Sequence, residues 1–179
     1  MREWKMNGVL GSLHIYCGQG KGKTTAALGL SVRALGAGFK VLFIQFIKNG
    51  SSSEFKVLKG HPLFTCKFAG SGRFLKGGSP SENDIEAAEK GFALAAEALK
   101  SGEFQLVVLD EAMAALSSGL LKLDALTEAL KGRAPGVEVV LTGRNPPPEL
   151  MEMADLVTEM RCVKHYYQAG RKAAKGIEF

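Results

Sequence analysis

Short runs of apolar residues alternate with segments in which apolar residues recur every three or four positions. The runs span residues 13–17, 40–47, 104–110, 137–142 and 156–160, and a further short run lies at 64–68. Near-continuous apolar runs are typical of strands buried on both faces, as in parallel sheets. Strands that alternate with helices predict an α/β fold with a mostly parallel sheet and helices on both of its faces.

Helices are predicted at residues 24–35, at 123–130, at 149–154 and after Ser79. Ser79 is a favourable N-cap, Pro80 suits the first helical position, and Glu82 completes the spacing of a capping box. The apolar stripe of that helix is expected to face the core and comprises Ile85, Ala88, Phe92, Ala95 and Leu99. Residues 48–78 are the least regular part of the chain, and long loops of this kind are often functional.

The bulk composition fits one globular domain. The chain has 179 residues, of which 46% are hydrophobic and 23% charged. We predict an N-terminal tail at residues 1–12 and a single domain at residues 13–179. No apolar run approaches the roughly 18–20 residues of a membrane span, and no signal-peptide core is present, so we expect a cytoplasmic protein with no membrane partner. The three cysteines are far apart, which argues against a zinc site or a disulfide framework.

The most informative stretch reads GQGKGKTT, residues 18–25. The common phosphate-binding loop reads G-x-x-x-x-G-K-S/T, and counting back from Gly22 places its first glycine at Cys17. The glycine comes instead at Gly18, so the loop is one residue short. It nevertheless follows a predicted strand and opens a predicted helix, which is the setting that a phosphate loop requires.

This loop is predicted to bind the phosphates of a nucleotide. The residues involved are Gly18, Gln19, Gly20, Lys21, Gly22, Lys23, Thr24 and Thr25. Backbone N–H groups at a helix N-terminus converge on an anion, and the helix dipole adds to the attraction. Lys23 places a positive charge on the phosphates, and the Thr24 hydroxyl is a ligand for Mg²⁺. The alternative is a glycine-rich turn with an incidental lysine.

A second candidate site lies where the run 104–110 ends in Asp110 and Glu111. Carboxylates at the C-terminal end of a strand lie where open α/β sheets bind ligands. We predict that this acidic pair is associated with Mg²⁺, with Glu111 holding the metal or orienting a water. Asp110 would also suit the N-cap of a following helix, and the two readings are compatible.

Two further segments carry candidate chemistry. Arg144 follows the strand 137–142 and is expected to stabilise phosphate charge, although a turn before a proline-capped helix is an equal reading. The C-terminal segment is basic and contains Tyr166 and Tyr167, so it is either a packed tail or a segment that closes over a ligand.

The net charge is +5, but no block of five or six like charges occurs, so nucleic acid is not a predicted partner.

The chain resembles the corrinoid adenosyltransferases of the cobalamin-biosynthesis type. The matching pieces, in order, are GQGKGKTTAA, VLFIQFIK, VVLDE, LTGRNPPPEL and ADLVTEMRCVKHYYQAGRKAAKGIEF. The shortened loop is itself a trait of that family. The resemblance implies a RecA-like P-loop domain in which the 5′-deoxyadenosyl group of ATP moves to the cobalt of a reduced corrinoid and tripolyphosphate leaves.

The resemblance also implies roles for individual residues. The loop from Gly18 to Thr24 would hold the triphosphate, and Lys23 would neutralise the leaving group. Thr24 and Glu111 would help bind Mg²⁺, with Asp110 close by, so Lys23, Thr24 and Glu111 are the candidate catalytic residues. Cob(I)alamin or a related corrinoid is the implied second substrate, a flavoprotein is the candidate reductant of the cobalt, and the family suggests a homodimer.

The sequence departs from the family pattern at two places. The family's middle loop often carries Phe-Thr-Trp against the corrinoid, whereas this chain has Gly72-Arg73-Phe74-Leu75, so Phe74 is the candidate corrinoid contact. Some members carry a longer N-terminal segment over the site, and here Trp4, the single tryptophan, lies in a short tail.

Two other classes of function stay open from the residues alone. A P-loop kinase or ATPase would direct attack at the γ-phosphorus and release ADP. A nucleotide-dependent binding protein would use the basic C-terminal segment on nucleic acid, with salt-dependent affinity.

Overall fold

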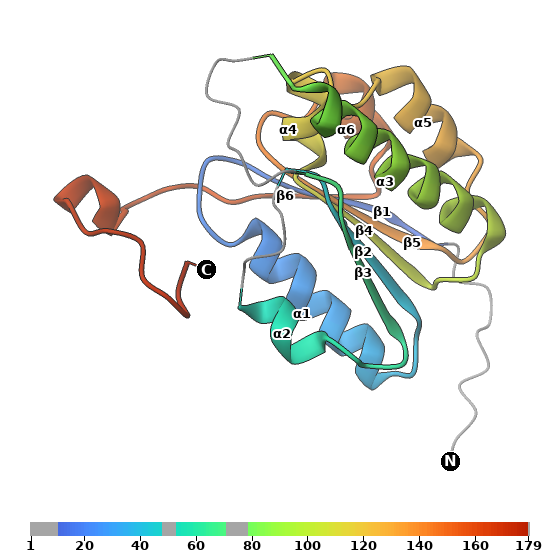
Figure 1. Cartoon of the computed structure of the whole chain (residues 1–179), viewed down its shortest axis with the longest axis horizontal. Coiled ribbons are helices and arrows are strands. Elements are labelled where there is room, and N and C mark those ends of the chain that lie inside the picture. The colour runs from blue at the N-terminus through green and yellow to red at the C-terminus, as the bar shows by residue number, and fades with distance from the viewer. Residues whose placement is uncertain (1–10, 48–52, 71–78, 179) are drawn as a thin grey trace.

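The computed structural model describes residues 11–47, 53–70 and 79–178, which form a three-layered α/β domain (Figure 1). A six-stranded sheet has the order β3-β2-β4-β5-β1-β6, and every paired strand is parallel to its neighbour. The strands are β1 (Leu13–Cys17), β2 (Val41–Gln45), β3 (Phe64–Phe68), β4 (Leu106–Asp110), β5 (Glu138–Thr142) and β6 (Leu156–Glu159). Strands β2 and β4 are buried at every position, whereas β6 is exposed along its length at the edge of the sheet.

Helices cover both faces of the sheet. The helices α1 (Lys23–Gly36) and α2 (Glu54–Leu58) lie on one face (Figure 1). The other face carries α3 (Glu82–Ser101), α4 (Ala112–Ser117), α5 (Leu123–Lys131) and α6 (Pro148–Met153). One buried hydrophobic cluster lies on each side of the sheet. A short 3₁₀ helix, η1 (Tyr166–Ala169), lies in the C-terminal segment away from the sheet.

The predicted fold is confirmed. Each predicted strand is present within two residues of its expected bounds, and all neighbours are parallel. The helices α2 and α4 were not predicted, because five and six residues are too few to establish a helical period. None of the helices in the described ranges is both long and apolar enough to cross a bilayer.

The N-terminus of α3 differs from the prediction, because the N-cap is Ser81 and not Ser79. The N–H of Asp84 donates to Ser81 Oγ at 3.3 Å, and the N–H of Ser81 donates to the Asp84 carboxylate at 3.1 Å. Both serines have an acidic residue three positions later, and the second pair is the one that forms the reciprocal capping box. Pro80 therefore precedes the cap instead of opening the helix.

Replacing Ser81 with alanine should lower the free energy of unfolding by about 1 kcal/mol, because it removes the side-chain acceptor of the cap. Ser79 is exposed, and Ser79→Ala should leave stability unchanged. Urea denaturation of the two variants measures the difference. Equal losses in both variants would contradict the assignment of the cap.

The predicted stripe of α3 is buried at Ala88, Ala95 and Leu99, but not at its first position. The buried positions include Ala88, Gly91, Ala95 and Ala98, whereas Ile85 is 40% exposed. The small residues let the helix approach the sheet closely: a β-carbon added at Gly91 would lie 2.4 Å from the β-carbon of Ala69. The expectation that Ile85 is core was therefore wrong, because close approach selects small side chains for the facing positions.

Candidate functional site

The candidate site lies at the carboxyl ends of β1, β4 and β5. The connection that follows β1 passes through α1 on one face to β2, and the connection that follows β5 passes through α6 on the other face to β6. Adjacent parallel strands whose connections diverge in this way open a crevice beyond their carboxyl ends, where α/β sheets bind ligands. The loop 18–22 stands in this crevice and leads directly into α1.

The conformation of the loop explains why its first glycine is Gly18. Cys17 is buried and still belongs to β1, in register with Glu159 of β6. Gly18 has a φ of +99°, and a β-carbon there would lie 2.5 Å from the carbonyl oxygen of Met160. That carbonyl accepts a hydrogen bond from the Gly20 N–H at 2.7 Å. The loop is therefore braced by the chain that leaves β6, and the turn begins one residue after the strand ends.

Lys23, the first residue of α1, extends its side chain back over the loop. Its ammonium donates hydrogen bonds of 2.8 Å to the carbonyl oxygens of both Gly18 and Gly20. Burial lowers the pKa of Lys23, and the Arg144 guanidinium adds to this effect, whereas the Glu111 carboxylate opposes it. The site thus holds a partly desolvated positive charge next to the N-terminus of a 14-residue helix.

Asp110 is the centre of a buried polar cluster. Its carboxylate, with no exposed surface, accepts hydrogen bonds from Thr24 Oγ1 at 2.9 and 3.2 Å and from Thr142 Oγ1 at 2.6 Å. Gln45 Nε2 also donates to it, at 2.6 Å. These donors come from α1, β5 and β2, so one carboxylate ties the start of α1 to two strands. The N-cap of α4 is Glu111, so Asp110 is not the helix cap considered above.

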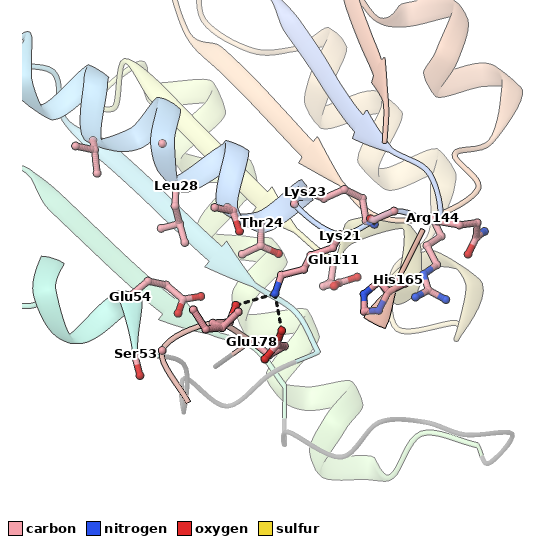
Figure 2. A pocket seen from close by; sticks show the side chains of 18 of the residues that line it. Lys21, Lys23, Thr24, Leu28, Ser53, Glu54, Glu111, Arg144, His165 and Glu178 are labelled. Carbon is pink, nitrogen blue, oxygen red and sulfur yellow. Dashed lines mark hydrogen bonds and ion pairs between the residues drawn. The ribbon is translucent and has the colours of Figure 1, made fainter. Parts of the chain in front are cut away.

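Glu111 has a backbone conformation that residues other than glycine rarely adopt. Its φ is +59° and its ψ is +26°, in the left-handed region. The Glu111 N–H donates to Thr142 Oγ1 at 2.9 Å, and this bond helps to hold the turn. Strain of about 1–3 kcal/mol is kept in folded proteins mainly at functional sites. Glu111 also lines the cavity, and in Figure 2 it lies close to Lys23 and Thr24.

A cavity of about 750 Å³ opens beside the loop. One side is formed by the loop and the start of α1 and is lined by Gln19, Gly20, Lys21, Gly22, Lys23, Thr24 and Thr25. Another side is apolar, with Leu28 and Val32 from α1 and Val57 from α2. The remaining wall includes residues from the C-terminal segment, among them His165 and Ile177. The cavity therefore combines a polar end suited to an anion with an apolar flank.

Most of the residues predicted from the sequence meet here. The structure brings together the loop, Glu111 and Arg144 around the cavity, with Asp110 buried directly behind Thr24 (Figure 2). Gln19 also donates to the Asn145 side chain at 3.3 Å, which links the loop to the turn after β5. The predicted corrinoid contact Phe74, with Arg73 and Leu75, and the N-terminal Trp4 lie outside the described residues.

Sequence reasoning missed one participant, Gln45, and did not foresee the contacts of another, Lys21. Gln45 is fully buried and is the only polar side chain in the strand VLFIQ. A glutamine at the end of such an apolar run could have indicated a polar contact at this edge of the sheet. Lys21 was predicted to bind phosphate, but its ammonium contacts the C-terminal segment, and no local pattern indicates that contact. Thr24 and the Glu111 carboxylate border the cavity and are the candidate ligands of a metal ion there.

Comparison with known proteins identifies the family. The family model described as "ATP:corrinoid adenosyltransferase BtuR/CobO/CobP" matches residues 10–179. The chain belongs to this family. It is 40% identical over 170 residues to the corrinoid adenosyltransferase of Pseudomonas aeruginosa, covering 94% of this chain and 84% of that protein. It is 35% identical to that of Escherichia coli K12 over 171 residues, and 34% identical to the corrinoid adenosyltransferase CobA of Salmonella typhimurium over 171 residues. Each of these two alignments covers 94% of this chain and 86% of the relative.

The family match covers the residues that surround the cavity. The match to the ATP:corrinoid adenosyltransferase model includes the loop, the acidic pair, the turn at Arg144 and the whole C-terminal segment. It therefore favours an adenosyltransferase over the kinase and ATPase that the loop alone left open. The resemblance proposed from the sequence is confirmed at the level of the family.

Proposed function

We propose that this chain transfers the 5′-deoxyadenosyl group of ATP to the cobalt of a reduced corrinoid and releases tripolyphosphate. The observation that carries the proposal is the cavity between the loop and α2, which is lined by the N-terminus of α1 with Lys23 at one end and has an apolar flank along α1. A ligand with a polyanionic part and a large apolar part matches both ends. Family membership supports the choice of reaction.

The reaction needs positioning and charge stabilisation more than proton transfer. The electron pair of Co(I) attacks C5′ of ATP, a cobalt–carbon bond forms, and the C5′–O bond breaks. Its electrons leave with the tripolyphosphate, and the cobalt becomes Co(III). No proton moves in this step, so the protein's work is to hold the two substrates in line and to stabilise the leaving anion. Lys23 and the N-terminus of α1 supply that stabilisation.

The site fits a magnesium ion carried with the triphosphate. Mg²⁺ favours oxygen ligands and usually binds through one or two protein groups together with phosphates and waters. Thr24 Oγ1 and the Glu111 carboxylate would hold it, and Asp110 would orient Thr24 through the hydrogen bonds at 2.9 and 3.2 Å. When bound, the ion would neutralise part of the charge that develops on the leaving tripolyphosphate.

An anaerobic assay tests the proposed function. The protein is mixed with ATP, Mg²⁺ and chemically reduced cobalamin, and the absorption spectrum is followed over time. We expect a light-sensitive cobalt–carbon product and one tripolyphosphate per product formed. Hydrolysis of ATP to ADP without a new cobalt–carbon bond would favour the ATPase alternative and contradict the proposal.

The remaining expectations about partners belong to this proposal. We expect the protein to act in the cytoplasm as a homodimer. A flavoprotein would supply the reduced cobalt, and Phe74 would contact the corrinoid. The alternative of a nucleic-acid-binding protein predicts salt-dependent binding to DNA or RNA. A gel-shift series at increasing salt tests it, and we expect no binding.

A further inference from the structure

The C-terminal strap, residues 164–178, is bonded to the loop through the side chain of Lys21. The Lys21 ammonium donates to the Ile177 carbonyl oxygen at 2.8 Å and to the Glu178 carboxylate at 2.9 Å (Figure 2). It also donates to the Tyr166 hydroxyl at 3.0 Å. An ammonium has three donors, and all three are used on the strap. Lys21 and Lys23, two residues apart, therefore make different contacts: Lys23 bonds to the loop and Lys21 to the strap.

The strap is folded so that it receives this ammonium. The Tyr166 hydroxyl donates to the Glu178 carboxylate, whose other oxygen accepts the Ala174 N–H at 2.5 Å. The Arg171 guanidinium lies 5.2 Å from the centre of the Tyr166 ring. The hydrogen bond from Lys21 lowers the pKa of Glu178, with a further contribution from the Ala174 N–H. The acceptors for Lys21 are thus fixed by contacts within the strap.

The strap is also part of the wall of the substrate cavity. His165, Gly176, Ile177 and Glu178 line the same cavity as the loop. Most of the strap is exposed, and Tyr167 is 74% exposed, so little buried surface holds the strap in place. A segment with few buried contacts opens readily unless specific bonds retain it. Its position over the cavity therefore depends strongly on the bonds to Lys21.

We propose that Lys21, Tyr166 and Glu178 form a latch that holds the C-terminal strap as a wall of the substrate cavity. Lys21 is then a positioning residue for the strap and not a ligand of the phosphates, in contrast to the expectation from the loop motif. The inference deepens the proposed function and rests on it for the identity of the substrates. The latch itself is a property of the folded chain and can be tested without them.

Limited trypsin digestion without substrates tests the latch. Arg171, Lys172 and Lys175 are cleavage sites within the strap. Glu178→Gln and Tyr166→Phe keep the side-chain shapes and weaken the latch, so cleavage in the strap should become about tenfold faster, as expected for the loss of one charge-assisted hydrogen bond. The matched controls are Glu89→Gln and Tyr167→Phe, both exposed and outside the latch, which should be cleaved at the wild-type rate. Mass spectrometry locates the cuts and distinguishes an open strap from a globally unfolded variant, which is cut throughout.

Steady-state kinetics of the same variants distinguish the latch from a phosphate ligand. We expect Lys21→Met, Glu178→Gln and Tyr166→Phe each to raise the KM for ATP by a similar factor, and the Lys21→Met/Glu178→Gln double variant to be no worse than either single one. A rise confined to Lys21→Met would make Lys21 a phosphate ligand and overturn the latch, as would wild-type cleavage rates in Glu178→Gln and Tyr166→Phe. Failure of the wild-type protein to make adenosylcorrinoid would reject the proposed function and leave the digestion result standing.

Discussion

Replacing Lys23 with alanine is expected to reduce kcat by about 10²–10³-fold, the usual effect of removing one preorganised group that stabilises a developing anion. The Lys23 ammonium lies at the start of α1 and directly over the loop, bonded to the carbonyl oxygens of Gly18 and Gly20. The leaving tripolyphosphate gains charge as the C5′–O bond breaks. Lys23 therefore interacts more strongly with the transition state than with bound ATP, and the main loss should fall on kcat.

The pH dependence gives this prediction a second measurement. Burial lowers the pKa of Lys23 below the ordinary lysine value of 10.5, so the ammonium loses its proton at a lower pH than an exposed lysine. The kcat/KM for ATP, which depends on the ionisation of the free enzyme, should therefore decline on the alkaline side at a pH below 10.5. Lys23→Arg keeps the charge at all accessible pH values, and this decline should be absent from its profile.

A lysine elsewhere provides the control for Lys23→Ala. Lys131 at the end of α5 is exposed, and Lys131→Ala should turn over at the wild-type rate. Thermal unfolding of both variants shows whether the fold is retained. Near-normal turnover in folded Lys23→Ala would remove Lys23 from the stabilisation of the leaving group and leave that role to the helix N-terminus.

The parts of the site that sequence predicts well are those set by local spacing. Gly22 caps α1 and Lys23 is its first residue, directly after a buried strand and a short loop. A strand–loop–helix unit is encoded within about 20 consecutive residues, so the start of this helix could be predicted within one residue. Asp110 and Glu111 could also be placed from the sequence, because they follow a buried strand and the carboxyl ends of parallel strands meet at one edge of the sheet. Cys17 stands where the common motif has its first glycine because it is still the last residue of strand β1.

The parts that sequence did not predict depend on contacts between distant residues. The Gln45–Asp110 hydrogen bond joins positions 65 residues apart, and the Lys21–Glu178 ion pair joins positions 157 apart. Neither pair leaves a local pattern, because the partners meet only in the folded chain. The pairing of β2 with β4 places Gln45 opposite Asp110, and the C-terminal segment returns to the loop and places Glu178 beside Lys21. The N-cap of α3 is a smaller case: both serines satisfy the local spacing rule, and the capping box forms between Ser81 and the buried Asp84.

Asp110→Asn is expected to be the second variant with a large effect on activity. Asparagine has the same shape and keeps one oxygen acceptor, but it removes the charge toward which Thr24, Thr142 and Gln45 donate. Thr24 would lose the charged acceptor that orients its hydroxyl for the metal and the phosphates. We expect kcat to fall about 10²-fold, comparable to the loss of one orienting outer-shell partner at a metal site.

The stability of Asp110→Asn should change by no more than a few kcal/mol, so the variant should still fold and its activity can be measured. A neutral amide is easier to bury than a carboxylate, and the Thr hydroxyls can rotate to accept from the new NH₂ group, so we expect a loss of about 1–3 kcal/mol from the imperfect pairing that remains. Guanidinium denaturation measures this loss, and Asp124→Asn on the exposed side of α5 is the matched control. Raising the Mg²⁺ concentration should recover part of the lost activity if Asp110 acts by orienting a metal ligand.

Two outcomes would contradict the role of Asp110 in orienting Thr24 as a metal ligand. If Asp110→Asn were strongly destabilised but turned over normally once folded, Asp110 would be a structural anchor between α1 and the sheet and nothing more. If turnover fell and Mg²⁺ made no difference at any concentration, Asp110 would act on the phosphates through Thr24 alone. The buried carboxylate contacts three side chains from three elements, so its charge and its shape can be separated by this one substitution.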